Sequence, residues 1–424
     1  MSKKGLIALI TATTLIATLL SGCSSNSKTV KEPAANTPVT LTYGIWDNVQ
    51  QPVYQKLADE YHKQNPNVTI KIQLTPWEQY WTKLDTAATG GTTHDLFWMD
   101  MPHSMIYESN GILQDLSDNI KNDKVDMNNF PEQLVNAYKY DNKTYGIPKD
   151  VDAIALWYNK KIFDAAKLPY PDDTWNWDKI HSVAKQLTDA KKGIYGFGAF
   201  YDPQIGIYNT IFQAGGEVIS KDKKTSLLDT PEAIAGIKFW TQFFTDKSTP
   251  TVQQMTDTDP TQMFQNGKLG MVFGGSWLQS TFLTDTNAKG FAEVAPLPQG
   301  KQKGVVTHSV ANVIGAKTTH PKEAWDFLKY LSSKEANQIV AESGQVIPAF
   351  KGTTDAWVKS NENFKLQVFV DELAYAHAYP ISQNTSGWES KCLEIFPKAY
   401  AGQMTAEEAC KKAAEEMNKV LSAN

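Results

Sequence analysis

The hydrophobic and polar positions of the N-terminal part of the chain change period several times, and this predicts alternating strands and helices. Residues 39–46 alternate and are rich in β-forming side chains, and residues 68–74 repeat the pattern. Apolar positions spaced three or four apart predict helices over 53–61 and 77–88. Residues 95–99 are mostly apolar, as is typical of a buried parallel strand. This alternation predicts an α/β fold.

The same alternation continues towards the C-terminus. Further extended segments and helices are predicted over 150–159, 196–201, 208–214 and 310–316. Another helix should begin at Pro231, a residue suited to a first helical turn, and its apolar side chains share one face: Ala233, Ile237, Trp240 and Phe244. Trp240 is therefore expected in the core. The spacing of Ser332 and Glu335 is that of a capping box, which predicts a helix start at Ser332.

The stretch from Met263 to Trp277 combines a helix end, a turn at 266–267 and a short apolar strand that ends in two glycines. Glycines a residue or two before a large aromatic side chain indicate a sharp bend or a close approach of the backbone to another group. A tight turn beside a buried core tryptophan would give the same pattern. This segment alone leaves both interpretations open.

The N-terminus has the layout of an export signal. Two lysines precede an apolar run over 5–20 that is too short for a typical transmembrane helix. Residues 20–23 (LSGC) then resemble a bacterial lipobox. We expect 1–22 to be a signal peptide that is removed, Cys23 to carry the lipid, and the small, polar residues of 23–38 to form a flexible tether. The mature protein would then be a lipoprotein on the extracellular face of the membrane of a Gram-positive bacterium.

Length and composition narrow the possible functions. A chain of 424 residues exceeds what one hydrophobic core usually organises, so two lobes are expected. A formal net charge of −5 without a basic stripe argues against a nucleic-acid partner. The seven histidines do not cluster, so neither a metal site nor a cofactor is predicted. Common catalytic motifs are missing from the sequence, although a glycosidase with two carboxylates across a cleft remains an alternative.

Two cysteines lie near the C-terminus. Cys392 and Cys410 stand on either side of a turn at 401–402, between helices predicted over 388–400 and 405–421. If these helices are antiparallel, the two thiols can meet, and export permits a disulfide. Two separately buried thiols are the other possibility.

Several short motifs, taken in order, carry a family resemblance. They are Trp46, Asn65-Pro66, Tyr80 with Lys83-Leu84, Gly90-Gly91, Asp95-Leu96, the YGIP at 145–148, the YNK at 158–160, the MFQNGKLGMVFGGSW at 263–277 and the GQMTAEEA at 402–409. Together they resemble the family-1 extracellular solute-binding proteins of ABC importers, which include the maltose-binding protein. One departure is His94, where the family usually has proline.

The resemblance implies a type II periplasmic-binding-protein fold, in which two α/β lobes are joined by three crossings and close around the ligand. The N-terminal lobe would comprise 39–150 and 311–345. The C-terminal lobe would comprise 151–310 and 346–424.

The resemblance also implies that Trp277 and Trp388 stack on a sugar ring. Ligands of open α/β sheets bind outside the carboxyl ends of the strands, which adds the residues at 46–47 and 98–100. The expected ligand-binding residues are Trp46, Asp47, Tyr80, Trp98, Asp100, Asp150, Asp152, Tyr201, Trp277, His308 and Trp388. For the carboxylates at 150 and 152, and for the histidine at 308, a structural role explains the sequence as well.

These observations predict a binding protein and not an enzyme. Its expected ligand is a carbohydrate, and the abundance of aromatic residues favours an oligosaccharide. The expected partners are the transmembrane subunits and the cytoplasmic ATPase of an ABC permease, with the chain itself a monomer. The alternatives are an exported glycosidase and a receptor for a non-sugar solute such as glycerol phosphate or a peptide.

Overall fold

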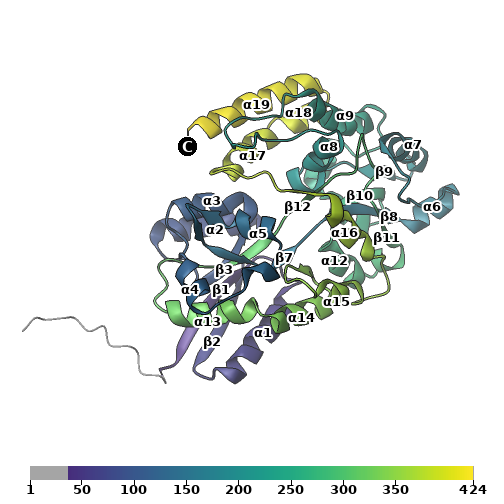
Figure 1. Ribbon diagram of the computed structural model, residues 1–424. Coiled ribbons are helices and arrows are strands. Elements are labelled where there is room, and N and C mark those ends of the chain that lie inside the picture. Colours follow the sequence, from purple (N-terminus) through teal and green to yellow (C-terminus); the bar gives the residue numbers. More distant parts are fainter. Residues whose placement is uncertain (1–36, 424) are drawn as a thin grey trace, which may run out of the picture. The chain divides into compact units, whose positions relative to one another are not determined.

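The computed structural model describes residues 37–423 (Figure 1). The predicted signal peptide, the lipidated Cys23 and almost all of the predicted tether lie outside the described residues. Residues 38–424 belong to one compact unit. Among the described residues, no helix has both the length and the apolar character needed to cross a membrane.

A five-stranded sheet forms the centre of one part of this unit. Its strands follow the order β2-β1-β3-β13-β6. They are β1 (Val39–Ile45), β2 (Val68–Leu74), β3 (Leu96–Asp100), β6 (Gly146–Pro148) and β13 (Val310–Ile314). Strands β1, β2 and β3 are parallel, whereas β13 runs antiparallel to β3 and β6. The three N-terminal strands were predicted from the sequence, and the structure confirms them.

Helices cover both faces of this sheet, with α2 and α3 on one side and α13 on the other (Figure 1). The helices of this part are α1 (Gln51–Gln64), α2 (Trp77–Gly90), α3 (Met101–Ser109), α4 (Ser117–Asn122), α5 (Glu132–Ala137), α13 (Pro321–Leu331) and α14 (Lys334–Ser343). In α1, the buried positions Val53, Leu57 and Tyr61 recur every fourth residue, so one stripe faces the core. Helix α2 is capped at its C-terminus by Gly91, whose φ of 66° is easily adopted only by glycine.

A separate four-stranded sheet has the order β11-β8-β10-β9. Its strands are β8 (Ile154–Asn159), β9 (Tyr195–Gly198), β10 (Leu269–Gly275) and β11 (Ala292–Ala295). Among the helices beside it are α7 (Trp177–Leu187), α8 (Tyr208–Gln213) and α9 (Pro231–Thr245). Trp240 on α9 is fully buried and donates its indole N–H to Thr210 Oγ1, which confirms the prediction of a core residue.

Three short segments connect the two sheets and bond to one another. Strand β7 (Asp150–Val151) pairs with β14 (Ile347–Pro348). The segment that follows β12 (Val305–Thr307) is hydrogen-bonded to the segment of β7. The Lys149 N–H donates to the Val310 carbonyl, and the Asp152 N–H donates to the His308 carbonyl. Strand β12 also pairs with β15 (Ala376–Ala378). Three crossings between two sheets were expected from the sequence, whereas the lobe boundaries remain a prediction.

The remaining elements are short, apart from the last helix. The strands are β4 (Lys139–Tyr140) and β5 (Lys143–Thr144), and the single turns of other helix types are η1 (Met127–Asn129), η2 (Pro203–Ile207), η3 (Ala288–Gly290) and η4 (Leu373–Tyr375). The helices are α6 (Lys160–Ala166), α10 (Val252–Asp257), α11 (Pro260–Gln265), α12 (Leu278–Thr284), α15 (Thr354–Val358), α16 (Gln367–Glu372), α17 (Thr385–Leu393), α18 (Phe396–Tyr400) and α19 (Ala406–Ser422).

The capping box predicted at Ser332 is wrong by one residue. Ser332 closes α13, and Ser333 caps α14 by accepting a hydrogen bond from the Ala336 N–H. The two serines are adjacent, so residue type alone does not show which of them has the extended backbone of an N-cap.

The two C-terminal cysteines are free thiols in the structure. Cys392 on α17 and Cys410 on α19 are both buried. Burial raises the pKa of each thiol. Of the two possibilities that the sequence left open, the structure has the buried thiols and not the disulfide.

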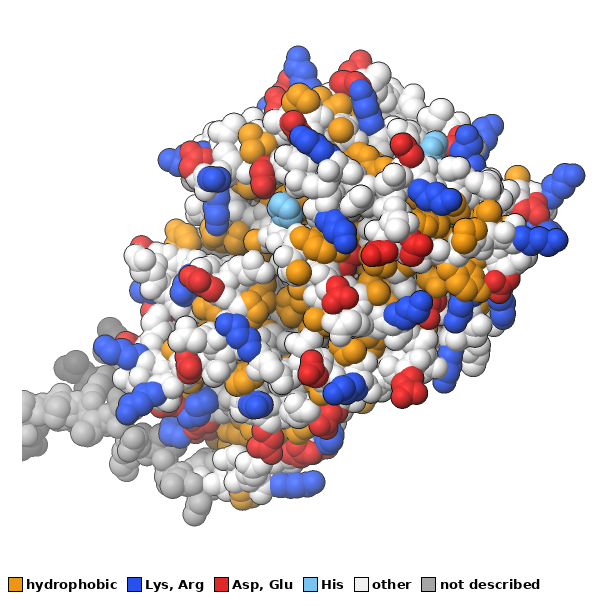
Figure 2. Space-filling model, turned by 45° about the vertical axis from the view of Figure 1, so that its right-hand side comes forward, with side chains coloured by type: hydrophobic (Ala, Val, Ile, Leu, Met, Phe, Trp, Pro, Cys, Tyr) orange, Lys and Arg blue, Asp and Glu red, His pale blue; other side chains and the backbone are white. Residues whose placement is uncertain are grey.

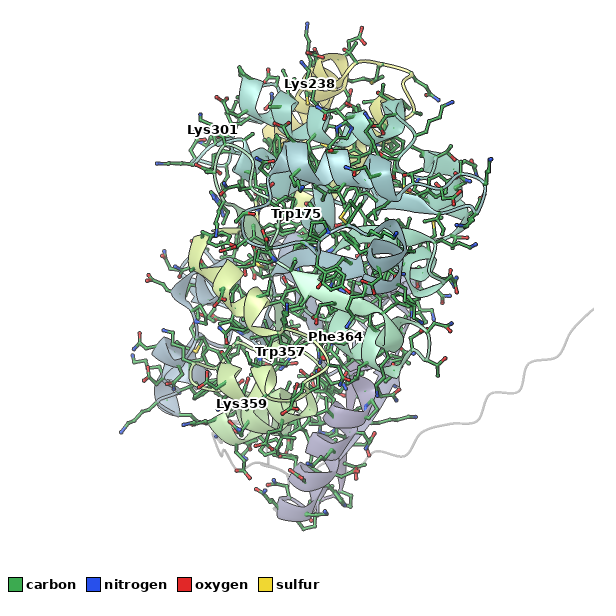
Figure 3. The ribbon with its side chains drawn as sticks, turned by 90° about the vertical axis from the view of Figure 1, so that its right-hand side faces the viewer. Trp175, Lys238, Lys301, Trp357, Lys359 and Phe364 are labelled. Atoms are coloured by element: carbon green, nitrogen blue, oxygen red, sulfur yellow. The ribbon has the colours of Figure 1, made fainter. Side chains whose placement is uncertain are left out.

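Large apolar side chains fill the interior, and lysines lie mainly at the surface, although a few charged residues such as Lys149 and Asp150 are buried. Figure 3 labels three buried aromatic residues, Trp175, Trp357 and Phe364, and three exposed lysines, Lys238, Lys301 and Lys359. On the face drawn in Figure 2, basic and acidic side chains are interspersed and form no stripe of one sign. Such a surface does not favour a polyanionic partner.

Candidate functional site

A cluster of aromatic side chains lies where β1 ends and α2 begins. Trp46 directly follows β1, and its ring meets Trp77 edge-on at 5.3 Å between ring centroids. Trp81, one turn further along α2, lies flat on His103 at 3.6 Å with an interplanar angle of 8°. Trp77 is 47% exposed, and the other three rings are partly exposed. We call these four residues (Trp46, Trp77, Trp81 and His103) the aromatic wall.

Asp100 fixes the orientation of His103. Its carboxylate caps α3 by accepting the His103 N–H at 3.0 Å, and the same oxygen lies 2.7 Å from His103 Nδ1. A carboxylate only accepts hydrogen bonds, so Nδ1 is the donor and Nε2 is left for other partners. Because Asp100 is only 2% exposed, the structure corrects its expected role from ligand contact to support of His103.

Two aromatic residues expected to contact ligand instead support the wall from behind. Trp98 is fully buried and donates its indole N–H to Tyr43 Oη at 2.7 Å. Tyr80 is 2% exposed and donates its hydroxyl to the Trp98 carbonyl. Both rings contact Trp46 edge-on, at 5.0 and 4.9 Å between centroids. Since neither ring has a free face, these two expectations are corrected to core packing.

A second group of polar side chains surrounds Asp152, which lies between β7 and β8. Asp152 Oδ1 accepts hydrogen bonds from Gln204 Nε2 at 2.9 Å and from the His308 N–H at 3.2 Å. Burial raises the pKa of the Asp152 carboxyl. Burial alone would lower the pKa of His308, but the Asp152 carboxylate, 3.5 Å from its Nδ1, raises it above the usual value. The structure thus brings together Asp152 and His308, two of the residues expected to contact ligand; that role stays a prediction.

Glu389 on α17 lies near this group, because its partner Tyr379 contacts the His308 ring at 5.3 Å between centroids. It accepts hydrogen bonds from the hydroxyls of Tyr208 and Tyr379, each at 2.7 Å. Burial raises its pKa to about 7, an effect that the two hydroxyls and the imidazole of His103 partly oppose. Helix α17 also contacts α3, which carries His103. A carboxylate that titrates near neutral pH therefore lies close to the aromatic wall.

The neighbouring Trp388 does not have its expected role. Its side chain is fully buried, and its indole N–H donates to Ser382 Oγ at 3.0 Å. The small residues that precede it begin α17, with Asn384 as the N-cap. Trp388 is thus a core residue of this helix, and the structure corrects its assignment as a stacking platform.

Trp277 follows β10 and remains partly exposed. Its ring lies directly over Gly275, where an added Cβ would come within 1.9 Å of the ring. This confirms that a glycine before Trp277 permits a close approach. Tyr201 is also partly exposed, with its hydroxyl 3.4 Å from Thr256 Oγ1. Both rings retain a surface that a solute can contact.

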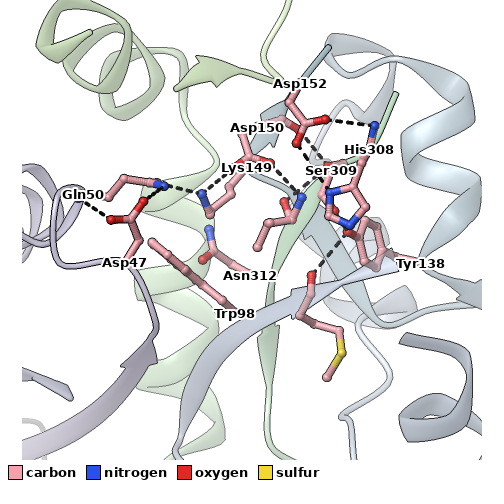
Figure 4. Close-up of polar contacts among 12 residues, drawn as sticks. Asp47, Gln50, Trp98, Tyr138, Lys149, Asp150, Asp152, His308, Ser309 and Asn312 are labelled. Atoms are coloured by element: carbon pink, nitrogen blue, oxygen red, sulfur yellow. Dashed lines mark hydrogen bonds and ion pairs between the residues drawn. The ribbon is translucent and has the colours of Figure 1, made fainter. Parts of the chain in front are cut away.

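Asp47 and Asp150 belong to one network of polar contacts (Figure 4). Asp47, partly exposed after β1, accepts hydrogen bonds from the Val49 N–H and from Gln50 Nε2, both at 2.7 Å. Asp150 is 5% exposed and pairs with the adjacent Lys149 at 2.5 Å. Its burial and pairing correct the expected ligand contact at Asp150 to a structural role in the connecting segments.

Several residues of this region were not predicted from the sequence. They are Trp77, Trp81, His103, Gln204, Tyr208, Tyr379 and Glu389. A signal was present for two of them, because Trp77 and Trp81 stand one helical turn apart, soon after a strand end. No such signal marks Glu389, because its partner Tyr208 is 181 positions away.

Within 37–423, no group of His, Cys, Asp or Glu side chains is arranged to hold a metal ion.

The sequence matches the model of the bacterial extracellular solute-binding protein family over residues 47–338. The chain belongs to this family. Its members are binding proteins and not enzymes, and the predicted membership is thereby confirmed.

Individual relatives are distant but similar over most of their length. A putative binding protein of Brucella abortus (strain 2308) is 25% identical over 359 residues, which cover 83% of this chain and 84% of the relative. The maltotriose-binding protein of Pyrococcus abyssi is 27% identical over 299 residues, or 68% of this chain and 62% of the relative.

The fold agrees with that of a solved structure. The ABC substrate-binding protein Lmo0181 of Listeria monocytogenes, in complex with cycloalternan, superposes with a TM-score of 0.84 at 24% identity. The match covers 91% of this chain and 99% of the Listeria chain. The predicted two-lobe α/β fold of periplasmic binding proteins is thereby confirmed.

Proposed function

We propose that this solute-binding protein captures a carbohydrate, and specifically an oligosaccharide, between the aromatic wall and the carboxylates of Asp152 and Glu389. The observation that carries the proposal is the contact between α17, which bears Glu389, and α3, which bears His103 of the wall. A sugar ring has an apolar face that stacks on indole, and its hydroxyls form hydrogen bonds with carboxylates. A site that combines the two suits a sugar better than an apolar solute.

Each side chain has a role in this proposal. Trp46 and Trp77 provide the stacking surface on one side, and Trp277 with Tyr201 provides it on the other. Hydroxyl groups of the sugar bond to Asp47, Asp152, His308 and Glu389. The names of two similar proteins, one a maltotriose-binding protein and one seen with cycloalternan, support an oligosaccharide over a monosaccharide.

The wider setting of the proposal comes from the family. The lobes 39–150 with 311–345 and 151–310 with 346–424 close around the sugar, because the closed form binds it more tightly than the open form. The loaded monomer, anchored through Cys23 to the extracellular face of the membrane of a Gram-positive bacterium, then delivers the sugar to an ABC permease with a cytoplasmic ATPase.

A thermal-shift screen of residues 24–424 tests the proposal. The saccharides are maltose, maltotriose, galacto-oligosaccharides, lactose and cycloalternan, with glycerol phosphate and a short peptide as non-sugar solutes. A solute that binds only the native state adds about 2.7 kcal/mol to stability at a hundredfold excess over Kd. We expect a shift with one oligosaccharide class and no product in the mixture. No shift with any saccharide, or consumption of the sugar, would contradict the proposal.

Trp77→Ala tests the aromatic wall itself. We expect its Kd for the saccharide found in the screen to rise by roughly ten- to a hundredfold, since burying an aromatic ring contributes about 1.5–3 kcal/mol. Tyr170→Ala is the matched control, because Tyr170 is a 40% exposed aromatic residue whose hydroxyl bonds to Asp164, outside the site. Equal affinities of the two variants in calorimetric titrations would remove Trp77 from the site.

A further inference from the structure

Lys149 is a buried lysine at the first connecting segment, between β6 and β7, with 5% of its surface exposed. Burying an ammonium group is costly unless partners replace its hydration. Lys149 has several partners (Figure 4): Nζ lies 2.5 Å from Asp150 Oδ2 and donates to Gln50 Oε1 at 3.1 Å. It also lies over the Trp98 ring, 4.1 Å from its centroid. These partners come from different parts of the chain.

One set of contacts leads from Lys149 to the proposed solute site. Gln50, bound to the ammonium through Oε1, donates from Nε2 to Asp47 Oδ2 at 2.7 Å. The other Asp47 oxygen accepts the Val49 N–H at 2.7 Å. The Trp98 ring under the ammonium contacts Trp46 of the aromatic wall. The position of the loop at 46–50 therefore depends on a cation that lies in a connecting segment.

The other set leads to the remaining connecting segments. Asp150, paired with Lys149, accepts the Val310 N–H at Oδ1 and the Ser309 hydroxyl at its backbone carbonyl, both at 2.7 Å. The backbone of Lys149 donates to the Val310 carbonyl and accepts the Ala349 N–H. Residues 149 and 150 thus bond to both of the other segments that connect the sheets.

We propose that Lys149 is a positioning residue that couples the loop at Asp47–Gln50 to the segments that connect the two sheets. A displacement of either side would leave a buried charge with one partner fewer, and the loss of a partner is costly where water cannot replace it. A solute held by the loop therefore favours one arrangement of the connecting segments. The relevance to solute capture rests on the proposed function, whereas the coupling itself is a property of the ligand-free protein.

Hydrogen exchange of the ligand-free protein tests the coupling directly. Lys149→Met keeps an unbranched side chain that is one heavy atom shorter, and removes the charge. We expect the Val49 and Val310 N–H groups, on opposite sides of the network, both to exchange roughly tenfold faster. Lys149→Arg should restore part of the protection at both sites. Lys161→Met is the control, because Lys161 is exposed on α6 and lies over the ring of Phe291. This control variant should leave the exchange rates of the Val49 and Val310 N–H groups unchanged.

A second variant keeps the test decisive if Lys149→Met does not fold. Gln50→Leu removes the contact between the loop and the ammonium and leaves the Lys149–Asp150 pair intact. Faster exchange at Val310, on the far side of the pair, would support the coupling. Faster exchange at Val49 alone would overturn it, because the two sides would then be independent.

Titration with maltotriose relates the coupling to solute capture. We expect Lys149→Met to raise the Kd for maltotriose roughly tenfold and Lys149→Arg to recover part of the loss, although neither side chain touches the sugar in the proposed site. An unchanged Kd with faster exchange would overturn the functional part of the inference. If the wild-type protein binds no maltotriose, the saccharide found in the screen takes its place. If it binds no saccharide at all, that result counts against the proposed function, and the exchange measurements alone decide the role of Lys149.

Discussion

Individual residues at equivalent places in the sequence have different roles in this protein. Trp46 and Trp98 both lie at or near the carboxyl end of a strand of the same sheet, so both were predicted to contact ligand. Only Trp46 retains an exposed surface, because the Trp98 ring is enclosed by Trp46, Tyr54 and the Lys149 ammonium. Strand position predicts nearness to the site, but it does not predict which side chain faces the solute.

Trp277 gives a prediction at the residue scale. Its partly exposed ring should stack on the bound saccharide, so Trp277→Ala should raise the Kd roughly tenfold or more while the protein stays folded. Calorimetric titration measures the affinity, and circular dichroism checks the fold. Unchanged affinity of the folded variant would refute the assignment of Trp277.

Gly275→Ala should also weaken binding, because the added Cβ has to displace the ring that lies 1.9 Å from its position. Gly290→Ala is a suitable control, since its Cβ would meet only Lys161 Nζ at 3.7 Å. A Gly275→Ala protein with wild-type affinity would show that the placement of the Trp277 ring is unimportant.

At the scale of elements, the periodicity of the sequence predicted most strands and helices, and the ends of elements were less certain. The strand over 68–74 has the predicted bounds, and the helix predicted over 77–88 is two residues longer. Both glycines before Trp277 lie within β10, although they were predicted to break the strand. Pairing with Ala155 and Ile154 of β8 holds Gly274 and Gly275 in extended geometry, which local sequence does not reveal.

The start of α14 gives a prediction at this scale. Ser333→Ala should lower the free energy of unfolding by about 1 kcal/mol, because it removes the hydroxyl that accepts the Ala336 N–H. Ser332→Ala removes only a hydroxyl that donates back to the Leu328 carbonyl and should cost less. Urea denaturation of both variants measures the difference. A larger loss for Ser332→Ala would place the cap at the residue predicted from sequence.

For the molecule as a whole, buried carboxylates without partners make stability depend on pH. Both oxygens of Glu108 on α3 are buried without a hydrogen bond, and burial raises the pKa of this group from 4.5 to about 8, although Lys223 partly opposes the shift. The folded state therefore binds this proton more tightly than the unfolded state does. The contribution of the protonated Glu108 carboxyl to the free energy of unfolding is complete below about pH 4.5 and is lost as the pH rises towards 8.

Glu108→Gln should therefore flatten the pH dependence of stability. At pH values above 8 the variant should unfold at a higher temperature than the wild type, because it no longer buries a charge, and below 4.5 the difference should disappear or reverse. Thermal unfolding across this range measures the effect. If the melting temperatures of the two proteins change in parallel with pH, the pKa of Glu108 is the same in the folded and unfolded states.

The sequence by itself determined the order of elements, the α/β class and the family. These properties depend on local periodicity, on turn residues and on motifs that can be read along the chain. The tertiary structure decided which aromatic side chains are exposed and which carboxylates are paired. Glu389 meets Tyr208 across 181 positions, and Lys149 meets Gln50 across 99. Burial and pairing arise from segments that become neighbours only on folding, and no local pattern records them.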